Sequence, residues 1–337
     1  MAFTQGRRSL LTFLLILIPF GILAFMLGRF CQSCVEATVE DSTLGTGSLK
    51  DPERSADTNG KARVYTWNGY KWTKLPEFCS FMETRNCHRL ITPSGDSPIF
   101  LHDIKDDIWI SGYIAKTGLW EPQNVNVILE QLRLDNKMGF IDLGSHVGAF
   151  SLSVAKAGRQ VVSVDPLPSN IRNLCQSVEY GELSAQITLL FNALSNTQQD
   201  VTFSFTPGNI AATEIRKSGN SEDMSVSGFC RRPLISHSVT LDDILPFVKF
   251  DKAFMKIDVE SMEFEVISGG RKLFNQIDVR GILMEWEHTK DSPKAPKLIN
   301  LLQGMGYRAF SPFDQGHQLL VNDYKNWTYD VIWLKHK

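Results

Sequence analysis

The chain lacks a strong excess of either charge, and it lacks any long run of basic residues. Its 337 residues include 35 Lys and Arg against 37 Asp and Glu, and its basic residues gather only in pairs such as Arg231-Arg232. Nucleic acid binding needs a concentrated positive surface, so this composition favours no nucleic acid partner. The chain also contains no internal repeats, so a repeat architecture is not expected.

Cysteine is scarce, at six residues. Cys31 and Cys34 have CxxC spacing, but no second pair lies at a matching distance, so a zinc site is not expected. In an oxidising compartment we expect Cys31 or Cys34 to link two chains into a dimer, whereas a cytoplasmic location would favour palmitoylation. Cys79 and Cys87 lie close enough in sequence to close a small disulfide loop, and Cys175 is expected in the core.

One segment, Leu10 to Leu27, has no charged side chain and is flanked by Arg7-Arg8 and Arg29. It is long enough to cross a bilayer, and it lacks a good cleavage site for a signal peptidase. The pattern predicts a transmembrane signal anchor over residues 10–28 with a cytoplasmic tail of residues 1–9. The remainder of a single-pass type II protein would lie in the lumen of the Golgi or another secretory membrane. The sequon at Asn326 agrees with that topology.

The next two segments differ sharply in composition. Residues 29–63 are poor in aromatic side chains and rich in Ser, Thr, Gly and charged residues, which predicts a disordered stem. Order is expected from Val64, where Tyr65, Trp67 and Trp72 crowd together. Aromatic density of this kind is more typical of a packed subdomain than of a carbohydrate platform. We therefore expect a small N-terminal subdomain over residues 64–137.

Residues 138–337 alternate strand-like and helix-like segments, which predicts an α/β fold with a mostly parallel sheet. The predicted strands are Gly139–Leu143, Val161–Asp165, Ile187–Asn192, Ala253–Asp258, Gly281–Trp286, Tyr307–Phe310 and Asp330–Leu334. The predicted helices are Ala149–Ala157, Ser169–Tyr180, Asp242–Phe247, Glu263–Phe274 and Lys294–Met305. A long insertion, Asn196 to Ser238, is expected to hold a hairpin around Val201–Phe205 and a polar loop over Lys217 to Ser227.

The most informative motif is the glycine turn between Asp142 and Phe150. An apolar strand ends in Asp142, turns through Gly144 and Gly148, and leads into an amphipathic helix. A second strand ends in Asp165, at the spacing where an acid accepts ribose hydroxyls, so an adenosine-containing cofactor is predicted. The turn lacks the G-x-G-x-x-G order of dinucleotide-binding oxidoreductases. A glycosyltransferase is the other alternative, but the chain has no Asp-x-Asp beyond the imperfect Asp258-Val-Glu260.

Five blocks in order resemble the FkbM-type branch of the S-adenosylmethionine-dependent methyltransferases. They are Ile141–Gly148, Asp165-Pro166 with Asn170, Ala193–Ser195, Val239–Asp243, and Lys256–Glu263 followed by Gly269-Gly270 and Glu285. Gly118–Pro122 is similar to the family's lead-in segment. The family usually has Ala-Asn in place of Ser145-His146, and Gly in place of Ser261. The resemblance implies a Rossmann-like, seven-stranded class I methyltransferase sheet with S-adenosylmethionine as cofactor.

The resemblance also assigns the cofactor site. Asp142 would orient the amino-acid portion of the cofactor, Asp165 would bind the ribose, and Asn192-Ala193 would meet the adenine edge. The full predicted set is Asp142, Gly144, Ser145, His146, Gly148, Asp165, Asn192 and Ala193. Structural alternatives stand beside these roles, since Asp142 can satisfy turn amides and Asp165 can cap the following helix.

Catalytic residues are expected after the fourth core strand. Lys256, Asp258 and Glu260 would share one face of that strand, and a buried lysine needs an acidic partner. A hydroxyl acceptor must lose a proton, and Asp258, Glu260 and His288 are the candidate bases. No metal is expected to be required. The predicted function is an O-methyltransferase acting on a glycan, lipid or small metabolite, with a glycan favoured; a Golgi-type glycosyltransferase or a non-catalytic methyltransferase-like scaffold is the alternative.

Overall fold

The computed structural model describes residues 60–79, 86–206, 208–217 and 235–335. The predicted cytoplasmic tail (1–9) and membrane anchor (10–28) lie outside these ranges, as do Cys31, Cys34 and all but the last residues of the predicted stem (29–63). Within the described ranges, no helix combines the length and apolar character needed to cross a membrane.

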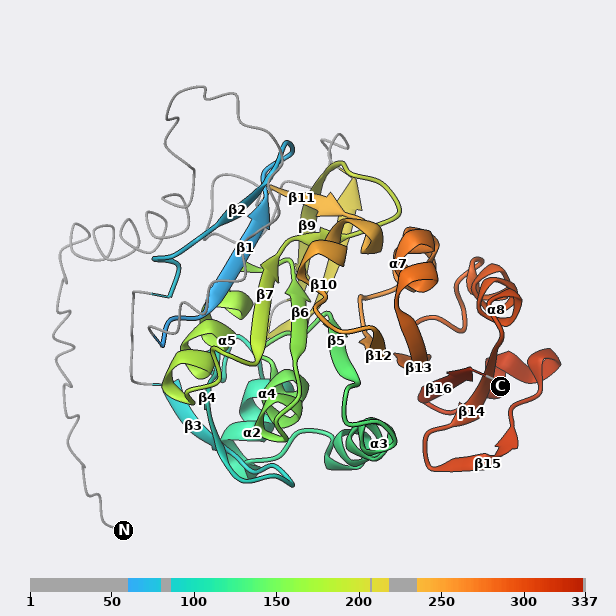
Figure 1. Ribbon diagram of the computed structural model, residues 1–337, viewed down its shortest axis with the longest axis horizontal. Coiled ribbons are helices and arrows are strands. Elements are labelled where there is room, and N and C mark those ends of the chain that lie inside the picture. The colour runs from blue at the N-terminus through green and yellow to red at the C-terminus, as the bar shows by residue number, and fades with distance from the viewer. Residues whose placement is uncertain (1–59, 80–85, 207, 218–234, 336–337) are drawn as a thin grey trace, which may run out of the picture. The chain divides into compact units, whose positions relative to one another are not determined.

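A ten-stranded mixed sheet organises the fold (Figure 1). Its order is β15 (Asp314–Gln318), β14 (Tyr307–Ser311), β16 (Asp330–Lys335), β13 (Asp278–Glu285), β12 (Lys252–Ile257), β5 (Gly139–Leu143), β6 (Val161–Asp165), β7 (Ile187–Phe191), β1 (Arg63–Trp67) and β2 (Trp72–Lys74). Neighbours from β13 to β1 run parallel, whereas β2, β15 and β16 pair antiparallel with their neighbours. The carboxyl ends of the parallel strands therefore meet at one edge, where ligands of open α/β sheets bind.

All seven predicted strands are present in this sheet, but the sheet has ten strands rather than seven. β1 and β2 carry the aromatic residues assigned to a separate subdomain; Tyr65 and Trp72 instead pack their rings against Phe247 and extend the sheet beside β7. β15 is mostly exposed and has no alternating apolar pattern, so no sequence signal marked it. The rest of residues 64–137 forms β3 (Cys87–Leu90), β4 (Ser97–Phe100), α2 (Ile110–Thr117) and α3 (Pro122–Arg133).

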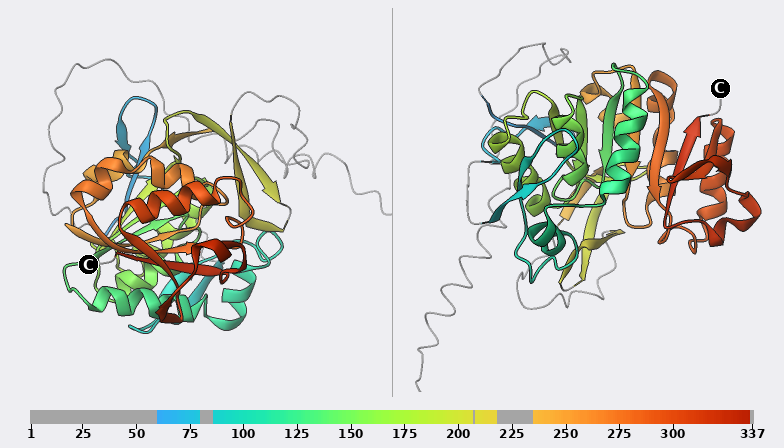
Figure 2. Two further views of the ribbon diagram at one scale, coloured as in Figure 1. Left: turned by 90° about the vertical axis from the view of Figure 1, so that its right-hand side faces the viewer. Right: turned by 90° about the horizontal axis from the view of Figure 1, so that it is seen from below.

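Consecutive residues of a strand point to opposite faces of the sheet. Because apolar residues stand at consecutive positions here, both faces must be buried, and helices cover each of them. Phe140 joins the core beneath α3, α4 (Ala149–Lys156) and α5 (Pro168–Tyr180). Ile141 joins the core beneath η2 (Leu241–Phe247), α6 (Glu263–Ser268), α7 (Arg271–Gln276) and α8 (Ala295–Gly304). Figure 2 (left) shows the orange and red helices on one side of the sheet and the teal and green helices on the other.

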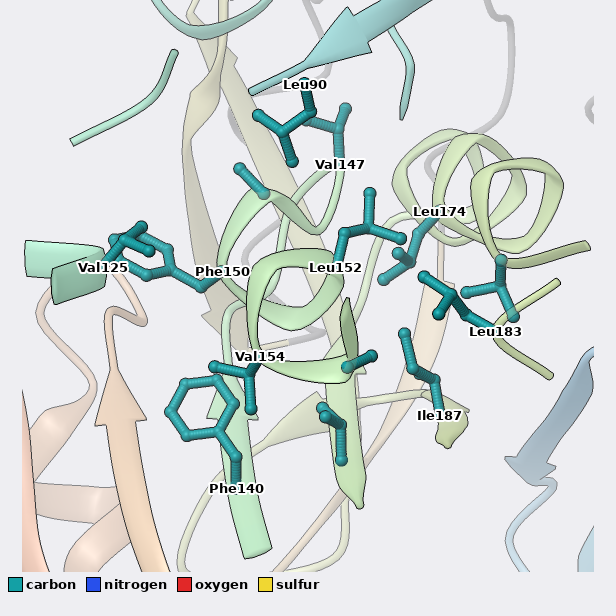
Figure 3. Close-up of a cluster of buried hydrophobic side chains, with 14 of the residues drawn as sticks. Leu90, Val125, Phe140, Val147, Phe150, Leu152, Val154, Leu174, Leu183 and Ile187 are labelled. Atoms are coloured by element: carbon teal, nitrogen blue, oxygen red, sulfur yellow. The ribbon is translucent and has the colours of Figure 1, made fainter. Parts of the chain in front are cut away.

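Helix α4 anchors the first of these cores (Figure 3). Its Phe150 points toward Val125 of α3, while Leu152 points toward Leu174 of α5. All four side chains are buried. The helix that follows the glycine turn is thereby fixed between its two neighbours, which also fixes the turn itself.

The predicted helix 263–274 is broken into α6 and α7 at Gly269-Gly270. A Cβ at Gly270 would lie 2.8 Å from Leu241 Cδ1, so η2 packs directly on the break. Asp242 Oδ1 accepts hydrogen bonds from the amides of Lys272 and Leu273, which caps α7. The segment predicted as helix 242–247 is a 3₁₀ helix, and its predicted capping box between Thr240 and Asp243 is confirmed.

The insertion supplies β9 (Asp200–Thr206), β10 (Asn209–Lys217) and most of β11 (Ile235–Val239) to a second sheet. The preceding strand β8 (Ala193–Leu194) completes it, in the order β10-β9-β11-β8. The predicted hairpin around Val201–Phe205 is confirmed as β9 and β10. Its turn joins the segment before α2, since the amide of Ile108 donates to Gly208 O at 3.1 Å. All but the first residue of the predicted loop Lys217 to Ser227 lies outside the described residues.

The disulfide differs from the predicted one. Cys79 pairs with Cys175 of α5, with their Cα atoms 5.7 Å apart, and both side chains are buried. Cys87 begins β3 and has no disulfide partner among the described residues. The predicted Cys79–Cys87 loop is therefore wrong, because nearness in sequence did not reveal that Cys79 packs against α5.

Substituting Cys175 by Ala should lower the free energy of unfolding by about 4.7 kcal/mol, the loop-entropy value for removing a crosslink between residues 96 apart in sequence. Chemical denaturation of the full chain would measure it. Cys87→Ala is the matched control and should change stability by no more than about 0.5 kcal/mol. Peptide mapping without reduction that recovered Cys79 linked to Cys87 would contradict the assignment.

Candidate active site

Lys256 occupies the centre of the candidate site. It lies on β12 directly opposite Asp142 of β5, and its Nζ is 2.9 Å from Asp258 Oδ2. The ammonium also lies 4.8 Å from the centroid of the Phe150 ring. Burial acts to lower the pKa of Lys256, but the carboxylates of Asp258, Asp142 and Glu121 outweigh it and raise that pKa. An acidic partner for Lys256 was expected, either Asp258 or Glu260; the structure shows that it is Asp258, and Lys256 is fully charged.

The ion pair with Lys256 also keeps Asp258 ionised. Burial alone would raise the pKa of Asp258, but Lys256 holds it below its ordinary value. Glu285, at the end of β13, hydrogen-bonds to Asp258 and to Tyr329. Burial and the Asp258 charge raise the pKa of Glu285 to about 9, so a protonated Glu285 donates to Asp258 at neutral pH.

Glu260 lies in the loop after β12 rather than on the strand. The strand ends at Ile257, and Glu260 and Ser261 have φ angles of 50° and 68°, in the left-handed region. The expected alternation that placed Glu260 on one face with Lys256 and Asp258 therefore stops before Glu260. Burial and the neighbouring Asp258 raise the pKa of Glu260 to about 8. Two successive non-glycine residues in this region mark a strained loop at the edge of the site.

Two acids of the site, Glu121 and Asp330, were not predicted from the sequence. Asn124 Nδ2 donates to Glu121 Oε2 and to Asp330 Oδ2, each at 2.8 Å, and so joins α3 to β16. Burial raises the pKa of Glu121 and of Asp330, while the nearby charge of Lys256 opposes both shifts. Glu121 lies in the lead-in segment Gly118–Pro122, which was the available signal; nothing in the pattern of β16 marked Asp330.

These residues form one group, named here the Lys256 cluster. It comprises Lys256 with Glu121, Asp142, Asp258, Glu260, Glu285 and Asp330. They come from the N-cap of α3, from the ends of β5, β12 and β13, from the loop after β12, and from the start of β16. The cluster therefore lies at the edge where the parallel strands end.

The glycines of the turn are required by contacts within the protein. At Gly144, φ is 77° and an added Cβ would lie 1.7 Å from the carbonyl oxygen of Asp258. At Gly148, φ is 84° and an added Cβ would lie 2.1 Å from Leu174 Cδ1. Gly144 thus brings the turn against the loop that holds Asp258, and Gly148 brings α4 against α5.

Asp165 holds the turn from the side of β6. Its Oδ2 accepts the amide of His146 at 2.9 Å, and its Oδ1 accepts the amide of Leu167 and Asn170 Nδ2 at 2.9 and 3.0 Å. Burial raises the pKa of Asp165 to about 7 although these three donors oppose the shift. Asp165 thus binds the residue that precedes α5 and the Asn170 side chain, without capping a first-turn amide of that helix, and a role toward ribose remains a prediction.

His146 lies between the turn and the segment before α2. Its ring is 5.4 Å from the ring of His102, and its Nε2 is 3.7 Å from Asp107 Oδ2. Burial and the His102 ring lower the pKa of His146 to about 3, so the imidazole is neutral at physiological pH. His102 Nε2 lies 2.7 Å from Asn170 Oδ1 and continues the network to α5. The segment before α2 is thus a wall of the site that the sequence did not indicate.

Asn192 hydrogen-bonds to other strands, and Ala193 is buried in the protein. Asn192 Oδ1 accepts the amide of Trp67, and its Nδ2 donates to the carbonyl oxygens of Trp67 and His237. Asn192 therefore ties β7 to β1 and β11, while Ala193 is fully buried in β8. An adenine contact by the Asn192 side chain remains a prediction, and it would compete with these three bonds.

His288 stands at the rim. Its side chain is 55% exposed, and its Nε2 lies 3.6 Å from Glu285 Oε1. Glu263, nearby, is buried and accepts a hydrogen bond from Thr289 Oγ1 at 3.0 Å. The site thus offers one exposed imidazole and several buried carboxylates as groups that could accept a proton.

Several polar atoms on the turn are left unpaired. Asp142 Oδ1, Ser145 Oγ and both ring nitrogens of His146 are buried and have no hydrogen-bond partner among the described residues. Asp142 Oδ2 is satisfied by Ser151 Oγ at 2.5 Å, so only one of its oxygens is free. Unpaired buried polar atoms are costly unless a ligand or water satisfies them, so their concentration on one turn fits a polar ligand.

Metal binding has little support from the described side chains. The one group of His, Cys, Asp and Glu with metal-like spacing among them is Cys79, Cys175 and Glu179, and its two cysteines form the disulfide. The carboxylates of the Lys256 cluster are not arranged closely enough to form such a group. That no metal is required remains a prediction.

Comparison with known proteins assigns the domain. Residues 142–309 match the family model described as the methyltransferase FkbM domain. The match spans the glycine turn, the loop after β12 and the end of β13, but it excludes Glu121 and Asp330. A search of curated proteins found no match to the chain.

Solved structures with weak similarity include several methyltransferases. Precorrin-6y C5,15-methyltransferase from Geobacter metallireducens is 12% identical, with 64% of this chain and 89% of that chain covered and a TM-score of 0.32. Magnesium protoporphyrin IX methyltransferase from Synechocystis with bound SAM is 16% identical, with 64% and 79% covered and a TM-score of 0.34. A SAM-dependent methyltransferase from Agrobacterium tumefaciens is 8% identical, with 78% and 72% covered and a TM-score of 0.37. At these TM-scores the likenesses carry no argument about this chain.

Ser261→Gly should stabilise the protein by about 0.5–1 kcal/mol, because glycine removes the left-handed strain at φ 68° at a smaller entropic cost. Ser261→Ala is the matched control: it retains the Cβ and should give no gain. Thermal and chemical denaturation would measure both variants. A glycine variant no more stable than the alanine variant would show that the loop is not strained at this residue.

Proposed function

Because the chain belongs to the FkbM family of S-adenosylmethionine-dependent methyltransferases, we propose that it is a membrane-anchored O-methyltransferase acting on a hydroxyl group of a glycan, lipid or small metabolite. The observation that carries the proposal is the set of unpaired polar atoms on the glycine turn, which lies beside the Lys256 cluster. The two features supply a place for a polar cofactor and carboxylates that can accept a proton.

The residues of the turn fit the cofactor's polar groups. Asp142 Oδ1 can accept from an ammonium group, Ser145 Oγ can donate or accept, and the neutral His146 ring offers one donor and one acceptor. Asp165 keeps acceptor capacity for ribose hydroxyls beyond its three present donors. When bound, S-adenosylmethionine supplies a methyl group on a positively charged sulfur.

Glu260 is the proposed base. Asp258 is a weak base because Lys256 lowers its pKa, whereas the pKa of Glu260, raised to about 8, lies near a working pH. The strained loop holds Glu260 away from the strand and beside Asp258. His288 is a less suitable base since its side chain is largely in solvent.

A lumenal location is part of the proposal, with the Golgi favoured. The buried disulfide between Cys79 and Cys175 supports an oxidising compartment. Asn326 of the sequon ends η3 (Val321–Asn326) and is exposed, as N-glycosylation requires. These features favour a glycan as acceptor, and they require that the cofactor be carried across the membrane from the cytosol.

Calorimetric titration of the full chain, purified from a secretory host, would test the cofactor assignment. We expect micromolar binding of S-adenosylmethionine and of its demethylated product, and no binding of NAD. Folded protein that bound neither of the first two would refute the proposed function.

Glu260→Gln should still bind the cofactor, though more weakly, and at saturating cofactor it should slow methyl transfer by about 100-fold or more, because the acceptor hydroxyl loses its base. In the unchanged chain, the rate should rise about tenfold per pH unit below pH 8, as Glu260 becomes ionised. Mass spectrometry of a panel of hydroxylated glycans incubated with cofactor would detect transfer. His288→Ala is the control; a loss of rate in that variant and not in Glu260→Gln would move the base to His288.

A further inference from the structure

The Lys256 cluster contains far more acidic groups than its one lysine can balance. Lys256 of β12 is paired with Asp142 on the adjacent strand β5 and contacts Asp258. Glu285 hydrogen-bonds to Asp258. His146, a second basic side chain that acts on Asp258, is neutral because burial lowers its pKa to about 3. Lys256 is therefore the one positive charge in the cluster.

Two buried acceptor atoms also lack partners, one on Asp142 of the cluster and one on Asn124, which donates to two of the cluster's acids. Asn124 is 4% exposed, and its amide lies between Glu121 and Asp330; its Oδ1 has no hydrogen-bond partner among the described residues. Asp142 is fully buried, acts on Lys256, and likewise has Oδ1 unpaired among those residues. Both atoms would be satisfied by a donor or by a positive charge and by no further acid.

The protonation of the cluster agrees with a missing cation. Burial and neighbouring carboxylates raise the pKa of Glu260 to about 8 and that of Glu285 to about 9. A carboxyl group that stays protonated for this reason ionises when a cation arrives, since the cation favours the charged form. Binding of a positive ligand would therefore release protons from this site.

We infer that the Lys256 cluster is a subsite for positive charge, which selects the sulfonium form of the cofactor over its neutral thioether product. The inference rests on the proposed function. It assigns a positioning role to Glu121 and Asp330, which lie outside the matched domain at residues 142–309 and enter the site from α3 and β16. A site that favours the charged cofactor over the neutral product also promotes product release after each methyl transfer.

The test compares two ligands that differ only in the methyl group and its charge. Calorimetric titration of the full chain should give tighter binding of S-adenosylmethionine than of S-adenosylhomocysteine. Glu121→Gln and Asp330→Asn should each weaken the first ligand about three- to tenfold and change the second by less than about twofold. Glu130→Gln, on an exposed residue of the same helix, is the control and should alter neither affinity.

The pH dependence gives a second readout. Affinity for the sulfonium form should rise between pH 7 and pH 9 as Glu260 and Glu285 ionise, whereas affinity for the thioether should rise less. The amino group of each ligand titrates in the same pH range, so its own titration, measured for each ligand free in solution, is subtracted before the two affinities are compared. The charged and titratable groups that face the two acids are Asp258, Lys256, Glu214, Glu263, His288 and Tyr329.

Each outcome decides the inference. A preference for the sulfonium form that both variants leave unchanged, or no preference at all, would overturn it while leaving the proposed function intact. Absence of binding by either ligand would overturn both. Because Glu121 and Asp330 lie on different elements, a folding defect in one variant leaves the other to give the answer.

Discussion

A single buried lysine sets the arrangement of the site. Lys256 lies in the central strand β12, and a charge in that position is tolerated only if acidic groups surround it. Asp258 contacts it directly, and Asp142 faces it from β5. The loop after β12, the end of β5 and the start of α3 are therefore held close together by one electrostatic requirement. The same requirement draws acids to the edge where a ligand binds.

Backbone packing supplies the other constraint. Gly144 lets the turn after β5 lie against the carbonyl of Asp258, at a distance that no side chain could share. Asp165 then fixes the far side of the turn by accepting the amide of His146. The turn is consequently rigid before any ligand arrives, and the unpaired atoms of Ser145 and His146 are presented at fixed positions. Such preorganisation reduces the cost of ordering a bound cofactor.

The structure shows the surroundings of two residues, His146 and Ser261, at which this chain departs from the usual family pattern. His146 stands where the family usually has Asn, and it has Asp107 and His102 as neighbours from a segment upstream of the matched domain. Ser261 stands where the family usually has Gly, and its φ of 68° is one that glycine adopts without strain. His146 has neighbouring side chains that accommodate it, whereas Ser261 leaves backbone strain beside Glu260.

The sequence by itself determined the central strands, most of the helices, the capping box at Thr240, the family and the need of Lys256 for an acidic partner within its own segment. These features depend on local periodicity, on glycine spacing, or on residues close together in one segment, so the sequence predicts them without the tertiary structure. Only the tertiary structure decided the partner of Cys79, the addition of β1 and β2 to the sheet, and the entry of Glu121 and Asp330 into the site. Those contacts join segments far apart in sequence, and each depends on how the strands are ordered in the sheet. The period-two pattern also did not predict the position of Glu260, because β12 ends at Ile257 and Glu260 has a left-handed backbone.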